Sequence, residues 1–114
     1  MWWPALLHNL DLKERRIAVL NHIVLFKLRD ASTENNEKAR EVLAGMAGKI
    51  PQLRHLEVGV NIVHSDRSYD LALVARFDSV DDLQVYQNHP VHVEVVKYIQ
   101  EVRQAAIVVD YEAP

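Results

Sequence analysis

Imidazole and phenol are the reactive groups that this sequence offers, because it contains six histidines and four tyrosines but no cysteine. The absence of cysteine excludes a thiolate nucleophile, a disulfide scaffold and a Cys-ligated zinc or iron–sulfur site. The three glycines are too few for a Gly-rich phosphate loop. Any chemistry is therefore expected to be acid–base chemistry in which histidine and tyrosine take part.

The run His89-Pro90-x-His92 is the most informative spacing of these groups. Pro90 suits the first position of a helix, so we expect His89 to cap that helix and His92 to lie near its third position. Free N–H groups and the helix dipole disfavour positive charge there, which predicts a lowered pKa for His92 and a neutral imidazole suited to a general base. A metal interpretation would combine His89 and His92 with His22, but Glu94 is the acidic residue that adjoins the motif, and we expect no metal.

The elements that must position these side chains follow from periodicity. Apolar, β-branched and alternating residues predict four strands, within 22–28, 53–63, 69–77 and 105–111. Helical spacing predicts one helix from Ser32 or Thr33 to Gly48, a second after Ser79 and a third from Pro90. This order is the ferredoxin-like, split βαβ pattern of an α+β fold, with a four-stranded antiparallel sheet in which 53–63 and 69–77 form a hairpin.

The 114 residues divide into an expected N-terminal extension, 1–18, and one domain, 19–112. The extension contains Trp2 and Trp3, and two interpretations stay open: a segment of little function, or an aromatic anchor that packs on the domain or on a partner. Its apolar start, residues 1–7, is too short for the apolar region of a signal peptide or for a membrane span, so we expect a cytoplasmic protein without a membrane partner. Thirteen basic against sixteen acidic residues give a net charge of −3, which provides no electrostatic footprint for nucleic acid.

The predicted strands are apolar on both faces, as Val24 and Phe26 alternate with Ile23 and Leu25. A sheet with one solvated face should instead alternate between apolar and polar residues. A monomer would leave a large apolar patch on the sheet face that the helices do not cover. We therefore expect a homodimer in which two sheets pack face to face.

The sequence resembles the stress-responsive A/B-barrel (Dabb) family over about residues 20–112. The motifs that carry the resemblance include HIVLFK at 22–27, IP at 50–51, RSYDLAL at 67–73, FDS at 77–79, YQNHPVHV at 86–93 and VDY at 109–111. The resemblance implies a dimeric α+β barrel built from two ferredoxin-like protomers, each with a cavity between its sheet and its helices.

The resemblance also implies roles for three residues. His92 matches the catalytic histidine of cyclase-like members, His22 matches a second pocket histidine on their first strand, and Tyr86 matches a pocket tyrosine. These would supply a base, an orienting group and a hydroxyl donor. The sequence departs from the cyclase pattern at Leu43, where that enzyme has another pocket tyrosine. A structural interpretation stays open, in which the two histidines form a hydrogen-bonded pair and Tyr86 is a core residue.

Three functions are therefore expected, in decreasing order of preference. The first is a Dabb protein of undefined role whose small apolar cavity binds a small hydrophobic ligand. The second is a cofactor-independent, polyketide-cyclase-like enzyme that uses His92, His22 and Tyr86. The third is a structural stress protein. No cofactor is expected in any of them, and His8, His55 and His64 are expected on the surface or in loops.

Overall fold

Residues 18–114 are described by a computed structural model of the chain. The expectations for Trp2, Trp3 and His8 lie outside these residues. The described elements are β1 (Val19–Leu28), α2 (Thr33–Ala44), β2 (His55–Val60), β3 (Leu71–Phe77), α3 (Val80–Asn88), α4 (Pro90–Val102) and β4 (Arg103–Ala113). The predicted order of strands and helices is confirmed, and so is the predicted break between α3 and α4.

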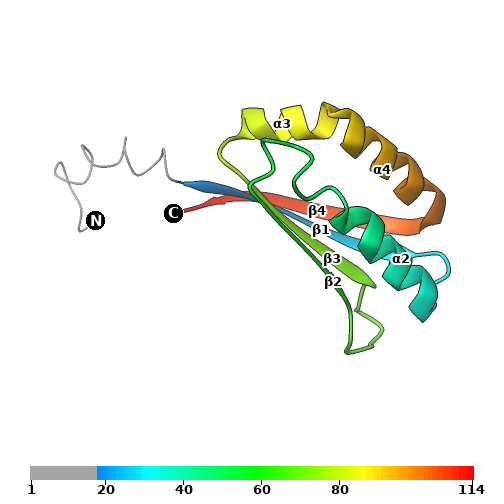
Figure 1. Cartoon of the computed structure of the whole chain (residues 1–114). Coiled ribbons are helices and arrows are strands. Elements are labelled where there is room, and N and C mark those ends of the chain that lie inside the picture. Colours follow the sequence, from blue (N-terminus) through cyan, green and yellow to red (C-terminus); the bar gives the residue numbers. More distant parts are fainter. Residues whose placement is uncertain (1–17) are drawn as a thin grey trace, which may run out of the picture.

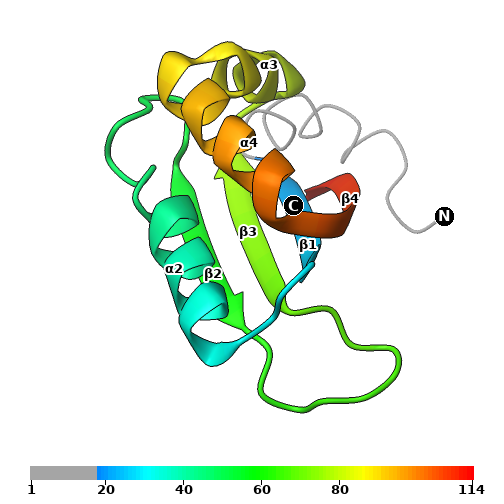
Figure 2. The ribbon, with the colours of Figure 1, turned by 90° about the vertical axis from the view of Figure 1, so that its right-hand side faces the viewer.

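The four strands form one antiparallel sheet in the order β2-β3-β1-β4. All three helices lie on one side of this sheet (Figure 1). Helix α2 packs on β2 and β3, and α4 runs beside it (Figure 2). The predicted α+β, ferredoxin-like fold is therefore confirmed, and the core lies between the helices and the inner face of the sheet.

Helix α2 is shorter than predicted at its C-terminal end. Its start is confirmed, because the Ser32 side chain accepts a hydrogen bond from the Asn35 N–H at 3.1 Å. The helix ends at Ala44, and the chain then turns over 45–49, a stretch that includes Gly48 with φ 77°. This turn brings Met46 into the core, where it is buried, and Gly48 supplies the left-handed residue that the turn requires.

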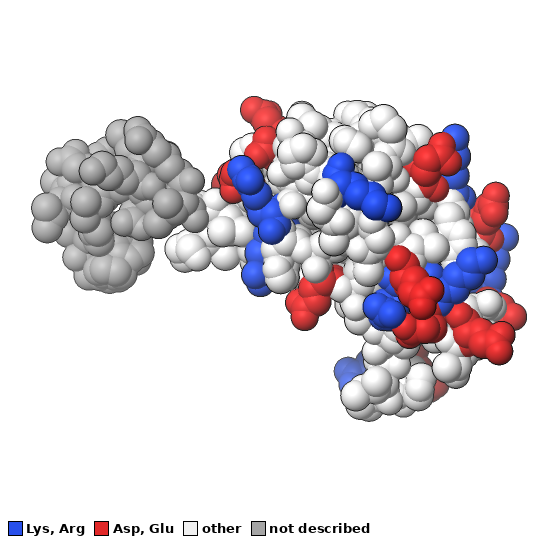
Figure 3. All heavy atoms as spheres, viewed as in Figure 1, with Lys and Arg blue, Asp and Glu red and all other residues white. Residues whose placement is uncertain are grey.

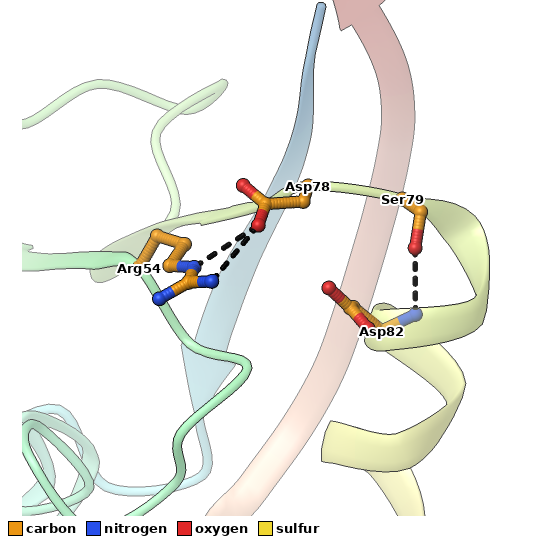
Figure 4. Close-up of polar contacts among 4 residues, drawn as sticks. All are labelled: Arg54, Asp78, Ser79 and Asp82. Atoms are coloured by element: carbon orange, nitrogen blue, oxygen red, sulfur yellow. Dashed lines mark hydrogen bonds and ion pairs between the residues drawn. The ribbon is translucent and has the colours of Figure 1, made fainter. Parts of the chain in front are cut away.

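Two polar contacts lie at the start of α3, the helix that carries Tyr86 (Figure 4). The Ser79 hydroxyl accepts the Asp82 N–H at 3.1 Å, as expected of a residue predicted to cap a helix. Just before it, Asp78 accepts hydrogen bonds from Arg54 at 3.0 and 3.2 Å, although this pair is exposed and contributes little stability. The cap therefore fixes where α3 leaves the sheet.

The sheet face opposite the helices is apolar over the middle of β1 and β3 and over β4, as predicted. The register places Ile23 of β1 beside Val109 of β4 and Val74 of β3. On β4, Ile107, Val109 and Tyr111 are 50%, 62% and 49% exposed. We call this surface the open face, and define it by Ile23, Leu25, Ala72, Val74, Ile107, Val109 and Tyr111.

Charged side chains of both signs are interspersed over the side of the molecule that carries α2 (Figure 3). They form no large region of one sign in that view, in keeping with the composition. Within residues 18–114, no helix has the length and apolarity that a membrane crossing requires.

Candidate functional site

A cavity of about 460 Å³ lies between the inner face of the sheet and the helices. This volume is within the range of small-molecule pockets. Its wall is mostly aliphatic and aromatic, with a few polar groups. The lining residues are His22, Val24, Phe26, Leu43, Met46, Leu73, Tyr86, Gln87, His92, Val95, Val96, Ile99, Gln100, Arg103, Ala106, Val108 and Asp110. The three residues singled out from the sequence, His22, Tyr86 and His92, thus share one cavity.

His22 is paired with Asp110 across the β1–β4 ladder. The two residues lie directly opposite each other in the register, and His22 Nδ1 is 2.5 Å from Asp110 Oδ1. The His22 side chain is 9% exposed and the Asp110 side chain 37%. An ionised carboxylate can only accept, so Nδ1 carries the hydrogen and Nε2 of the neutral ring keeps its lone pair. The carboxylate therefore fixes the tautomer of His22.

Asp110 is a site residue that sequence reasoning missed, although the VDY motif was noted. One signal could have found it: a lone carboxylate within the apolar run Ile107–Tyr111, two residues beyond Val108 and hence on the same strand face. The periodicity gives that face, but the partner strand and register depend on the tertiary fold.

Tyr86 packs near both histidines. Its ring centroid is 6.1 Å from that of His22 and 4.4 Å from that of His92, and it packs on Phe77 at 4.9 Å. Tyr86 is 1% exposed, and burial raises the pKa of its phenol, so the hydroxyl stays protonated. The hydroxyl donates to Met46 Sδ at 3.9 Å, and a thioether is a weak acceptor. The O–H can therefore exchange this contact for a ligand oxygen.

His92 is the third residue of α4, as predicted, and its Nδ1 is 3.1 Å from the Gln87 carbonyl oxygen. A carbonyl can only accept, so Nδ1 carries the hydrogen here as well, and Nε2 of the neutral ring has no hydrogen-bond partner within residues 18–114. The pKa of His92 is lowered, mainly by burial and further by the nearby His22 imidazole, because two protonated rings would repel, while the Gln87 hydrogen bond opposes the shift. The predicted direction is confirmed, but burial replaces the helix dipole as the main cause.

His89 caps α4, as predicted, and does not line the cavity. Its Nδ1 accepts the Val91 N–H at 3.1 Å. It is therefore not brought together with His22 and His92, the set on which the metal interpretation rested. Among residues 18–114, no three His, Asp or Glu side chains form a metal-binding group. His55 and His64 are exposed, as expected.

This arrangement is suited to proton transfer. Two imidazoles are held through Nδ1 and leave Nε2 without a hydrogen-bond partner among residues 18–114, a phenol supplies a hydroxyl donor, and the surrounding wall is mostly apolar. Leu43 lies in this wall, so the position that departs from the cyclase pattern adds apolar surface where a hydroxyl would otherwise stand.

Comparison with known proteins shows the family to which this fold and site belong. Residues 20–113 match the model of the stress-responsive A/B barrel (Dabb) domain, and the chain belongs to that family. It is 31% identical over 103 residues to the Stress-response A/B barrel domain-containing protein DABB1 of Arabidopsis thaliana, covering 84% of this chain and 48% of that protein. The chain thus spans about half the length of this relative.

Solved structures share the fold. A dimeric protein of unknown function with a ferredoxin-like fold, from Bacteroides fragilis, is 35% identical with a TM-score of 0.72, covering 83% of this chain and 96% of that chain. A hydroxynitrile lyase from Passiflora edulis has a TM-score of 0.72 at 15% identity, covering 84% of this chain and 94% of that one. The second likeness is one of fold alone.

Proposed function

We propose that this Dabb protein is a homodimer that binds a small, mostly apolar molecule in the cavity of each protomer. The observation that carries the proposal is the cavity of about 460 Å³, whose apolar wall holds a few convergent polar groups. Apolar pockets with few, well-placed polar groups are typical of small-molecule sites. Ligand identity is then set by shape and by the hydrogen bonds available at His22, Tyr86 and His92.

Binding is tested with an apolar fluorescent probe, N-phenyl-1-naphthylamine, titrated into the full chain. A Val108→Trp variant places an indole at the cavity wall, and Val108 is 54% exposed, so the fold can accommodate the change. We expect the variant to weaken probe binding about tenfold, because the indole occupies ligand volume. Val85→Trp is the matched control, since Val85 is 47% exposed on α3 and does not line this cavity. Equal affinity of the Val108→Trp chain and the natural chain contradicts the proposal.

The homodimer is proposed to form through the open face. Its β4 residues are about half exposed in the single chain and those on β1 and β3 are partly exposed, and soluble monomers rarely tolerate a continuous apolar patch. The related Bacteroides fragilis protein is dimeric, which supports a dimer here. The strands of the two sheets would then pack apolar face to apolar face.

A second candidate function is cofactor-independent acid–base catalysis on a carbonyl compound. The observation that favours it is the His22–Asp110 pair at 2.5 Å, with the Tyr86 ring 6.1 Å from that of His22. This proposal exchanges the roles that the resemblance implied for the two histidines, because His22 is the one paired with a carboxylate. Nε2 of His22 takes a proton from the carbon next to a carbonyl group, and Asp110 stabilises the imidazolium that forms. The electron pair moves onto the carbonyl oxygen, which accepts a hydrogen bond from Tyr86. Neutral His92 orients the substrate from the other side.

Catalysis of this kind is tested without knowledge of the natural substrate, by following deuterium incorporation next to the carbonyl group of 2-octanone in D₂O. We expect exchange above the buffer rate and a loss of about tenfold or more in a His22→Gln variant. His64→Gln is the control, because His64 is exposed on a loop. Exchange at the buffer rate, or unchanged by His22→Gln, removes the enzyme candidate and leaves the binding proposal standing.

A further inference from the structure

The cavity has two chemically different ends. In the β1–β4 register, His22 faces Asp110 at one end and Leu28 faces Arg103 at the other. Six residues of β1 separate these positions, which is about 20 Å of strand. Helix α4 runs in the same sense, from His92 to Arg103, over about 16 Å. An elongated ligand that follows the strand and the helix would therefore meet the histidines at one end and Arg103 at the other.

Arg103 brings a positive charge to its end of the cavity. It lines the cavity and is partly buried, and none of the ion pairs formed within residues 18–114 includes it. Its backbone carbonyl accepts a hydrogen bond from Arg29 Nε at 3.0 Å, so a second guanidinium lies nearby. Gln100, three residues earlier on α4, adds an amide to the same end of the wall. A guanidinium in such a place is suited to bidentate pairing with a carboxylate.

The wall between the two ends is apolar. Val24 and Phe26 of β1, Ala106 of β4, and Val95 and Ile99 of α4 line it. Such a surface favours an alkyl chain over a polar one, because each buried CH₂ group contributes about 0.8 kcal/mol. The order along the cavity is therefore cation, apolar wall, and imidazole pair.

We propose that the cavity takes an elongated amphiphilic carboxylate, which pairs its carboxylate with Arg103, lays its alkyl chain along Phe26 and Ile99, and presents its far end to His22 and His92. This inference rests on the proposed ligand-binding function and names the chemical class of the ligand. It also orients the ligand, because the charged end lies away from the histidines.

The test compares decanoate with decan-1-ol, which share a chain length but differ in head group. Binding is measured by calorimetry at pH 8, where a histidine of ordinary pKa, about 6.5, is neutral. We expect the natural chain to prefer decanoate about tenfold or more. Arg103→Gln is expected to abolish that preference while decan-1-ol affinity stays the same. Arg67→Gln, in the exposed β2–β3 loop, should leave both affinities unchanged.

Two results overturn the inference while the proposed function stands. One is decan-1-ol binding with no preference for decanoate in the natural chain. The other is a preference that survives Arg103→Gln but is lost in His22→Gln, which places the carboxylate at the opposite end. Failure of both compounds and of N-phenyl-1-naphthylamine to bind contradicts the proposed function itself. Arg103→Lys keeps the charge and should keep part of the preference, so it serves as a second variant where Arg103→Gln does not fold.

Discussion

Single residues determine which nitrogen of each ring is available for chemistry. His22 donates through Nδ1 to a carboxylate, and His92 donates through Nδ1 to a backbone carbonyl. The two partners differ in one respect: a side chain can be replaced, whereas the Gln87 carbonyl cannot. Asp110 is therefore the position at which the tautomer of one histidine can be changed without altering the other.

We predict that Asp110→Asn changes the tautomer of His22. The amide of Asn can donate to Nδ1, which a carboxylate cannot, so a ring protonated at Nε2 becomes populated. Long-range ¹⁵N–¹H spectra of the imidazole rings at pH 8 should show a mixture for His22 and an unchanged His92. Asp78→Asn is the matched control, because Asp78 pairs with Arg54 away from the cavity. A single, unchanged His22 tautomer in Asp110→Asn would show that Asp110 does not position the ring.

The lowered pKa of His92 predicts how the stability of the fold depends on pH. The unfolded chain takes up a proton at His92 near the ordinary pKa of about 6.5, whereas burial lowers the pKa in the folded chain. Between these two pKa values the unfolded state binds more protons, so this contribution to stability falls as the pH drops below about 6.5 and levels off below the folded pKa. Urea denaturation from pH 5 to 7.5 should show a shallower pH dependence for His92→Gln than for the natural chain. His64→Gln should retain the natural slope, and an unchanged slope in His92→Gln would contradict the assignment.

The sequence predicts much of this site and misses one residue for a physical reason. The His-Pro-x-His spacing places His89 and His92 through local rules of helix initiation, and both placements are confirmed. The resemblance singled out His22 and Tyr86, which line the same cavity as His92. Asp110 becomes visible only when β4 is paired with β1 in a specific register, which is a tertiary property.

At the scale of elements, helix caps control how the site is assembled. Helices α3 and α4 are separated by His89, whose extended backbone ends one helix while its side chain caps the next. This break places Tyr86 and His92 against each other, although they belong to different helices. In one continuous helix, Tyr86 and His92 would instead lie six positions apart along the same helix axis.

We predict that Ser79→Ala and Ser32→Ala lower stability by the same amount, but that only Ser79→Ala weakens ligand binding. Each variant removes an N-cap hydrogen bond of 3.1 Å and should cost about 1 kcal/mol in the free energy of unfolding. Ser79 starts α3, which carries Tyr86, so its loss should also weaken binding of N-phenyl-1-naphthylamine. Ser32 starts α2, farther along the sheet from the histidine pair, and its loss should leave probe affinity nearly unchanged. Urea denaturation and probe titration measure both effects, and equal loss of affinity in the two variants would contradict the assignment.

Element boundaries show where local rules stop being sufficient. The predicted helix end at Gly48 is wrong, because Met46 and Ile50 turn into the core and the helix has already ended at Ala44. The strand faces are predicted correctly, since alternation needs no knowledge of the partner strand. How the turn at 45–49 packs depends on contacts with the whole core. The periodicity of the sequence contains no information about those contacts.

At the scale of the whole molecule, strand β4 contributes side chains both to the cavity and to the open face. Val108 and Asp110 line the cavity, while Ile107, Val109 and Tyr111 belong to the open face. β4 is an edge strand, and in the single chain its outer side chains are about half exposed. A partner packed on the open face would restrain this strand and, through it, the position of Asp110 beside His22. Assembly and ligand binding are therefore expected to be coupled.

We predict that Val109→Lys both separates the protomers and weakens ligand binding. A charge placed at the centre of an apolar interface is left without a partner, so the dimer dissociation constant should rise about 100-fold or more. Analytical ultracentrifugation over a range of protein concentrations measures this change.

Without its partner, β4 should hold Asp110 less firmly. Affinity for N-phenyl-1-naphthylamine should therefore fall at concentrations where the Val109→Lys variant is monomeric. Val93→Lys is the matched control, because Val93 is 40% exposed on α4, on the helical side of the sheet, and should change neither measurement. A Val109→Lys chain that remains dimeric would exclude the open face as the interface, and a monomeric variant with natural affinity would show that each cavity is complete within one protomer.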